Sequence, residues 1–224
     1  MRFKLGAVAI LAVCAMQAQE ETPDHRLRSA AEVFSDIMRA PDKGIPDSVL
    51  RRAECAVIVP GLKKGAFIVG GDYGRGFALC RHHGAWGAPA AVKFSGGSFG
   101  PQIGVESTDI VLLVMDKKGM ERLASDKFTI GADASAAAGP VGRTAAADTD
   151  ASMRAEILAW SRTHGVFAGI SLDGTVVSKD GSEDRKLYGE SVSNHQILLG
   201  TVKAPAGAQP LVAELDRYSP GPKR

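Results

Sequence analysis

The feature that most constrains the fold is the uneven distribution of glycine. The chain has 26 glycines among 224 residues, and 12 of them lie between Gly61 and Gly104. Glycine is unfavourable inside helices and suits turns, bulges and close backbone approach. The apolar runs in and next to this part of the chain (55–59, 66–70 and 76–80) are short and bounded by turn residues. This half of the chain is therefore expected to form short antiparallel strands rather than helices.

Similar patterns continue along the chain. Further strands are expected at residues 90–94, 102–106, 110–115, 127–132, 166–172 and 175–177. The last of these follows Asp173-Gly174, which is a hairpin signal. Residues 155–162 fit a helix or a strand, and their pattern alone does not decide between the two. The central region is thus predicted to be a sheet or a partly closed barrel.

Helical patterns lie mainly towards the two ends. Residues 25–39 place apolar side chains at helical spacing and charged ones on the other faces, which is typical of an amphipathic helix. Shorter helices are expected at 46–52, 116–123, 193–199 and 211–218. The fold class predicted is α+β, with an antiparallel β-sheet or partly closed barrel of short Gly-rich strands and helices at the N- and C-terminal ends. Residues 24–218 are predicted to form a single domain, and 219–224 a C-terminal tail.

The N-terminus has the pattern of a secretory signal peptide. Arg2 and Lys4 precede an apolar run, residues 5–15, that is too short to span a bilayer. Cleavage after Ala18 makes residues 1–18 the signal, and Ala15 is the alternative cleavage position. The alternative is that the protein is a lipoprotein, in which Cys14 is acylated. Either way the protein is expected to be exported, and to be periplasmic or envelope-associated.

Cleavage also changes the charge and the number of cysteines. The chain has 27 Lys and Arg against 25 Asp and Glu, so losing Arg2 and Lys4 leaves 25 against 25. A neutral chain lacks the global basic field that binds nucleic acid, which makes nucleic acid an unexpected partner. Cys55 and Cys80 remain as an even pair in an oxidising compartment, where a disulfide and two buried thiols are the alternatives.

One string has the appearance of a catalytic motif. Residues 96–100 read Gly-Gly-Ser-Phe-Gly, which fits the G-x-S-x-G pattern around the nucleophile of serine hydrolases. That motif requires a strand before the serine and a helix after it, whereas Gly100, Pro101 and Gly104 are poor helix residues. A hydrolase using Ser98 is therefore the remote alternative. No metal-ligand spacing or phosphate loop is recognised, so no cofactor and no metal are expected.

Local charge points to a membrane surface. Between Gly61 and Lys93 there are five cations and one anion, Asp72, and further arginines lie in the helical N-terminal region. Basic residues beside an amphipathic helix are typical of contact with anionic lipid. From the periodicity alone, the preferred interpretation is that the apolar residues of this helix close the core and the charges form a solvated rim. The candidate lipid-binding residues are Arg26, Arg28, Phe34, Ile37, Met38, Arg39, Arg51, Arg52, Lys63 and Lys64.

Several longer strings resemble a known family. Ile58-Val59-Pro60, Lys63-Lys64-Gly65 and Phe67-Ile68-Val69-Gly70-Gly71 are followed by Gly96-Gly97-Ser98-Phe99-Gly100-Pro101-Gln102-Ile103-Gly104 and Gly165-Val166-Phe167-Ala168-Gly169. In this order they are similar to the SYLF domain, also called the Ysc84 actin-binding domain, over about residues 27–200. The resemblance implies that Gly96–Gly100 is a scaffold signature and favours a strand at 155–162.

The resemblance also implies a function. Eukaryotic members bind phosphoinositides, in the best-understood cases through an amphipathic N-terminal helix, and fungal relatives bind actin filaments. It implies no catalysis. For an exported chain the expected partner is the anionic phospholipid of the envelope, with actin a partner only by family analogy. The expected function is a non-enzymatic lipid-binding module, and the alternative is an envelope structural or protein-interaction domain without lipid binding.

Overall fold

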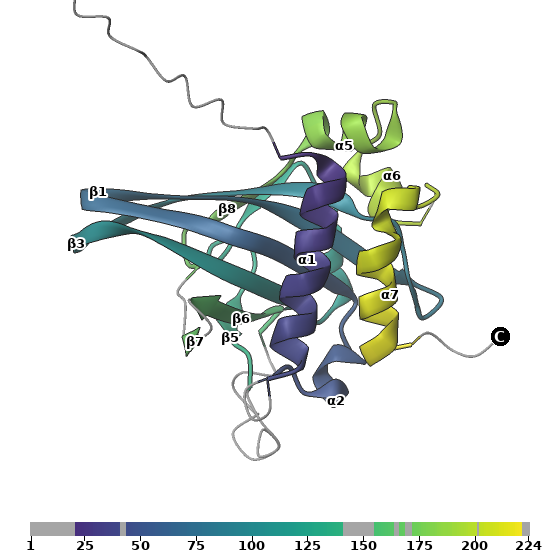
Figure 1. Cartoon of the computed structure of the whole chain (residues 1–224), viewed down its shortest axis with the longest axis horizontal. Coiled ribbons are helices and arrows are strands. Elements are labelled where there is room, and N and C mark those ends of the chain that lie inside the picture. The colour runs from purple at the N-terminus through teal and green to yellow at the C-terminus, as the bar shows by residue number, and fades with distance from the viewer. Residues whose placement is uncertain are drawn as a thin grey trace, which may run out of the picture.

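The computed structural model describes residues 21–40, 44–140, 155–163, 166–168, 172–200 and 202–220 (Figure 1). The expected signal peptide, with the acylation candidate Cys14, lies outside these residues. The described chain is α+β, as predicted, with a curled mixed sheet that forms a half-barrel and helices at both ends. None of its described helices is long and apolar enough to cross a lipid bilayer.

The first helices form close to where the sequence places them. Helix α1 (Pro23–Met38) begins at Thr22, whose hydroxyl accepts a hydrogen bond from the His25 backbone N–H. This bond satisfies one of the free N–H groups of the first turn, and Pro23 has none to satisfy. Helix α2 (Asp47–Leu50) follows as a single turn, shorter than the predicted 46–52.

The sheet is built on two long strands, β1 (Cys55–His82) and β3 (Ala90–Val114). They pair antiparallel from Cys55 opposite Val114 to Ala78 opposite Ala90, and we call this pair of strands the ribbon. The prediction of short separate strands was wrong here. The turn residues that suggested breaks produce bends and register shifts within continuous strands, between Val59 and Leu62 and between Phe67 and Ile68.

The ribbon folds back on itself, so its two ends meet. The Arg81 N–H donates to the Glu54 carbonyl at 2.8 Å, and Cys55 and Cys80 form a disulfide with their Cα atoms 4.0 Å apart. Where the arms of β1 cross, a Cβ atom at Gly76 would lie 2.1 Å from the Ile58 carbonyl oxygen. Only glycine allows this approach. Because the ends meet, the middle of the ribbon extends furthest away, beyond α1 on the left of Figure 1.

Shorter strands complete the sheet. They are β2 (Ala85–Trp86), β4 (Lys127–Thr129), β5 (Ala136–Ala138), β6 (Ile157–Thr163), β7 (Val166–Ala168) and β8 (Val176–Lys179). Strand β8 pairs with one arm of β3 and with β4, and β6 pairs with the other arm of β3. Strand β5 runs parallel to β6, which makes the sheet mixed rather than wholly antiparallel. The ambiguous segment 155–162 is thus mostly strand β6, as the family resemblance favoured.

The remaining helices lie in the second half of the chain. They are α3 (Lys117–Leu123), α5 (Gly181–Tyr188), α6 (Asn194–Leu198), the 3-10 turn η1 (Ala206–Ala208) and α7 (Gln209–Tyr218). Asp116 caps α3 and Ser193 caps α6, as their positions predict, and Gln196 completes a capping box at α6. Helix α5 was not predicted from the sequence.

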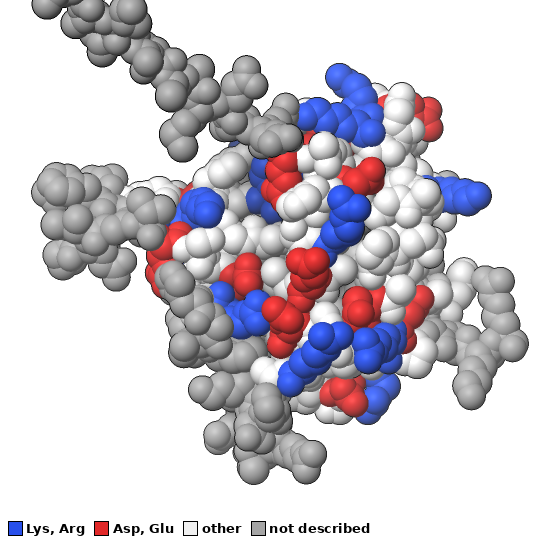
Figure 2. Space-filling model, in the orientation of Figure 1, with Lys and Arg blue, Asp and Glu red and all other residues white. Residues whose placement is uncertain are grey.

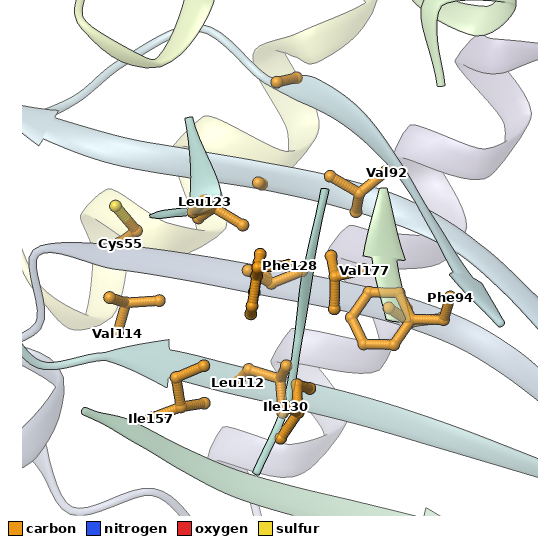
Figure 3. Packing of buried hydrophobic residues seen from close by; sticks show 14 of the residues in the cluster. Cys55, Val92, Phe94, Leu112, Val114, Leu123, Phe128, Ile130, Ile157 and Val177 are labelled. Carbon is orange, nitrogen blue, oxygen red and sulfur yellow. The ribbon is translucent and has the colours of Figure 1, made fainter. Parts of the chain in front are cut away.

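Both faces of the sheet are covered, and side chains alternate between two cores. Cys55, Val57 and Val59 point into the concave side with residues of α3, α6, β4 and β8, as Figure 3 shows for Val92, Phe94 and Val177. The intervening side chains point to the opposite side, where α1, α2 and α7 pack. This period of two is the geometry of strands buried on both faces.

Candidate functional site

The apolar side of α1 belongs to the core. Leu27, Phe34 and Ile37 are fully buried in the cluster shared with α7, and the Phe34 ring meets Tyr218 edge to face at 6.0 Å. Phe34 and Ile37, predicted to enter a lipid interface, are therefore inaccessible while α1 is docked, and Met38 is half-buried. The sequence periodicity is the same for a helix that faces lipid and one that faces a core, which is why it did not separate the two.

Arg26 is buried as well, in a group of charged residues that holds α1 to α5. Its guanidinium forms an ion pair with Glu183 of α5, and the side chains of Arg26 and Glu183 are only 7% and 1% exposed. Arg75 of β1 donates to Asp180 at 2.7 Å and to Glu183 at 2.9 Å. Lys93 of β3 lies 3.1 Å from Asp180. We call these residues, together with Asp184, the buried charge cluster.

The cluster sets the ionisation of its carboxyl groups. Burial alone would raise the pKa of Asp180, but hydrogen bonds from Ser182, Arg75 and Lys93 outweigh it and lower the pKa below its ordinary value. Asp184 differs because no basic side chain among the described residues offsets the effect of burial on its pKa. Desolvation, together with the charges of Asp180 and Glu183, raises its pKa to about 7, against a hydrogen bond from the Ala91 N–H. Its second carboxylate oxygen is buried without a partner among the described residues.

Sequence reasoning missed this cluster. Arg75 and Lys93 were counted as part of a basic patch, and the acidic residues of α5 received no structural role. The signal that could have found them is the pairing of Asp180, a helix N-cap, with Glu183 and Asp184 in the first turn, which is typical of a helix start.

The other predicted lipid-binding residues are distributed over the surface. Arg28, Arg39, Arg51, Arg52 and Lys63 are exposed, whereas Lys64 is half-buried 4.0 Å from Asp72. Arg39 ends α1, and Arg51 and Arg52 directly follow α2, which lies beside that end of α1 (Figure 1). We call these three the α1–α2 arginines. Lys63 is on the ribbon, where its amine donates to the Ser107 hydroxyl at 3.3 Å.

The outer surface of α1 is mixed in charge. Glu32 and Asp36 are exposed among the arginines, and Asp36 pairs with Arg162 of β6 at 2.9 Å. Figure 2 shows acidic and basic atoms interleaved on this face, with basic ones gathered near the end of α1 and α2. The α1 surface as a whole is thus not a continuous basic patch.

The remaining chemical candidates do not assemble a reaction centre among the described residues. The backbone of Ser98 pairs with Gly70 inside strand β3, which runs on to Val114, so the strand-to-helix turn of a serine nucleophile is not formed there. The described part of the chain holds no group of three or more His, Cys, Asp and Glu residues arranged for a metal ion.

The described residues define the class of fold: an α+β protein with a curled half-barrel sheet and an N-terminal helix docked on it. The family model for Ysc84, described as a Las17-binding protein and actin regulator, matches residues 95–218. The chain belongs to this Ysc84 (SYLF) family.

Named relatives support the same assignment. The chain is 35% identical over 179 residues to Protein YSC84 of Saccharomyces cerevisiae, covering 78% of this chain and 38% of that protein. It is 39% identical over 176 residues to an SH3 domain-containing protein of Schizosaccharomyces pombe, covering 77% of this chain and 41% of the relative. It is 31% identical over 195 residues to SH3 domain-containing YSC84-like protein 1 of Homo sapiens, covering 86% of this chain and 56% of that protein. The chain thus spans roughly two fifths to just over half of these relatives, and their names indicate no catalytic activity.

Proposed function

We propose that this protein is an exported, non-enzymatic module that attaches to anionic membrane surfaces through the α1–α2 arginines. The observation that carries the proposal is the exposure of Arg39, Arg51 and Arg52 at one end of the helical layer. Each basic residue close to an anionic bilayer contributes about 1 kcal/mol of attraction. Three together therefore give a reversible, salt-sensitive attachment.

In this proposal α1 remains docked. Lifting its apolar side into lipid would expose Leu27, Phe34 and Ile37 and would separate the buried pair of Arg26 and Glu183. Breaking a buried ion pair by removing one partner costs about 3–5 kcal/mol. Contact through exposed arginines avoids that cost, so the binding energy is electrostatic rather than hydrophobic at this end of the molecule.

Export is part of the same proposal. The N-terminal segment has the charge and length of a signal peptide, and the Cys55–Cys80 disulfide suits an oxidising compartment. The expected location is periplasmic or envelope-associated, and the lipid expected there is anionic phospholipid.

The test is co-sedimentation with vesicles of phosphatidylcholine alone and of phosphatidylcholine mixed equally with phosphatidylglycerol, at low and raised salt. Replacing Arg39, Arg51 and Arg52 by Glu should weaken binding to the anionic vesicles by at least about 100-fold. The matched control carries the same charge change at exposed lysines elsewhere: Lys117→Glu, Lys127→Glu and Lys203→Glu. Equal loss in both triple variants would mean that only net charge matters, and the proposed surface would be rejected.

A protein-interaction domain is the second candidate, and the mixed charge on the outer face of α1 favours it. Glu32 and Asp36 beside Arg28 suit a charge-complementary protein surface better than a uniformly anionic bilayer. Relatives named as Las17-binding add support by analogy. Failure of the wild-type protein to bind any vesicle, with a Glu32→Lys variant losing a partner captured by cross-linking in the envelope, would favour this function.

A further inference from the structure

Helix α5 is attached to the start of β3 by hydrogen bonds at both of its ends. At its first turn, the Asp180 N–H donates to the Ala91 carbonyl at 2.9 Å, and the Ala91 N–H donates to the Asp184 carboxylate at 2.8 Å. At its last turn, the Tyr188 hydroxyl donates to the Pro89 carbonyl at 2.6 Å. Both backbone groups of Ala91 are thus bonded to α5, one of them through the Asp184 side chain.

The same first turn of α5 holds the first half of α1. Glu183, the residue before Asp184, pairs with Arg26 of α1, and both of these side chains are buried. Arg75 of β1 donates to Glu183 as well, at 2.9 Å. In Figure 1 α5 lies next to the N-terminal end of α1. Because Glu183 and Asp184 are consecutive, a displacement of this turn from β3 also separates Glu183 from Arg26.

The second half of α1 is attached to other elements. Asp36 pairs with Arg162 of β6 at 2.9 Å, and Phe34 and Ile37 are fully buried in the cluster shared with α7. These contacts lie on β6 and α7 rather than on α5. The first half of α1 can therefore be released while the second half stays docked.

Asp184 differs from the other acids of the buried charge cluster in its surroundings. The basic residues of the cluster make their ion pairs with Asp180 and Glu183. Asp184 is only 1% exposed, one of its oxygens accepts the Ala91 N–H, and the other has no hydrogen-bond partner in the described part of the chain. A carboxyl group buried in this way is costly in its ionised form. The docked turn therefore favours the protonated acid.

Neighbouring acids add to the effect of burial. Desolvation is the largest cause of the raised pKa of Asp184, about 7, and the charges of Asp180 and Glu183 raise it further. Burial also raises the pKa of Tyr188, which therefore stays neutral between pH 5 and pH 8. The charged and titratable side chains on the elements around Asp184 are Asp180, Glu183 and Tyr188 of α5, Arg75 of β1, Lys93 of β3, and His25 and Arg26 of α1.

We propose that Asp184 and Glu183 form a proton-controlled latch, in which protonated Asp184 docks the first turn of α5 on β3 and Glu183 in turn holds the first half of α1. Ionised Asp184 is better solvated in an open state than in the docked one, so a rise in pH favours opening. Opening exposes Leu27 and Ala30, which are fully buried in the docked state. The latch lies at the other end of α1 from the α1–α2 arginines and is independent of the proposed membrane attachment.

The test is backbone hydrogen exchange of the full chain without lipid, between pH 5 and pH 8, expressed relative to unstructured peptides at the same pH. The reporters are residues 26–31 of α1 and 181–188 of α5, with 110–114 of β3 as the core reference. In the wild type, α1 and α5 should share one opening equilibrium and exchange faster than the reference. That equilibrium should rise about tenfold per pH unit up to about pH 7 and then level off, because opening releases one proton. Asp184→Asn keeps the shape of the side chain but does not ionise, so it should abolish the rise.

Three further variants separate the latch from other effects. Glu190→Gln changes an exposed carboxyl group just after α5, and His25→Gln removes the exposed histidine of α1, so both should keep the wild-type rise. Arg26→Gln breaks the link between the two helices. In this variant α5 should keep its pH dependence, whereas the first half of α1 should exchange quickly at every pH.

Three outcomes would overturn the latch. The first is a rise in α5 with no rise in α1 of the wild type, and the second is a rise that persists in Asp184→Asn. The third is exchange of α1 at the rate of the β3 reference, because α1 would then open only when the whole protein unfolds. Vesicle binding by the α1–α2 arginines is measured separately, so the failure of either proposal leaves the other standing.

Discussion

The two ends of the ribbon are made of the same two strands and are built in different ways. At the closed end, a disulfide joins the arms of β1, and the Arg81 guanidinium lies 3.9 Å from the centroid of the Trp86 ring while bonding the Gly84 carbonyl at 2.7 Å. At the opposite end, where the ribbon bends, no charged residue occurs between Lys64 and Asp72 or between Lys93 and Glu106. The comparison teaches that the closed end is held by a covalent bond and by side-chain contacts, whereas the bend is made by a register shift in the backbone pairing of the two strands.

The largest expected effect concerns the buried charge cluster, which ties the body of the ribbon to α5 and α1. Replacing Glu183 by Ala leaves Arg26 buried without its carboxylate and takes one acceptor from Arg75. A loss of about 4 kcal/mol in the free energy of unfolding is expected. Urea denaturation measures it, with exposed Arg51→Ala as the control, for which a change within about 0.5 kcal/mol is expected. Similar losses in both variants would contradict the assignment of stability to the cluster.

The next largest effect concerns the disulfide. Cys55 and Cys80 are 25 residues apart, and opening a loop of that size should cost about 3 kcal/mol through the greater freedom of the unfolded chain. The change is Cys55→Ser with Cys80→Ser, measured by thermal unfolding against the oxidised wild type. If the disulfide acts only on the closed end, the double variant keeps its vesicle binding. A parallel loss of binding would show that the membrane-binding surface depends on the closed end.

A smaller, pH-dependent effect is expected from Asp184. Its pKa is raised from 3.8 to about 7 in the folded protein, so the folded state holds the proton more tightly than the unfolded state. Its contribution to stability therefore falls as the pH rises from about 4 to about 7 and is level above that. Between pH 5 and pH 8 the Asp184→Asn variant should gain about 2 kcal/mol relative to wild type. Parallel stability curves for the two proteins would contradict this.

The smallest effect should be at the projecting end. Tyr73 is half exposed, so Tyr73→Ser should change the free energy of unfolding by no more than about 0.5 kcal/mol. Phe77→Ser, four positions along the same strand and fully buried, is the contrasting variant and should cost several times more. Comparable destabilisation by the two changes would mean that the ribbon is uniformly supported, and the comparison between its ends would fail.

Much of the fold could be predicted because local signals agree with it. Thr22 and Pro23 at the start of α1, Asp116 before α3 and Ser193 before α6 are capping signals that act within a single turn. The α+β class followed from the change between helical and strand periodicity. The length of β1 could not be predicted in this way. In the sequence Gly76 resembles a strand breaker, and only the structure shows that the neighbouring arm of β1 requires a glycine there.

The candidate site could be predicted only in part. Arg39, Arg51 and Arg52 are exposed in the structure, but Arg26 has the same charge and the same helical context and is buried. What separates them is Glu183, which lies 157 residues further along the chain. A partner at that separation leaves no periodic or compositional trace near Arg26. The signal peptide, the acylation of Cys14 and the lipid partner stay predictions.

The register of the ribbon also has a consequence for the order in which the chain assembles. The pair Ala78 and Ala90 is 12 residues apart in sequence, whereas Cys55 and Val114 are 59 apart, and the pairs between them widen steadily. If pairing starts at Ala78 and Ala90 and proceeds outward, each new pair lengthens the closed loop by only a few residues. If pairing started at Cys55 and Val114, the whole intervening segment would have to be closed in one step. Nucleation is therefore expected next to β2, and the segment that carries Cys55 is expected to join last.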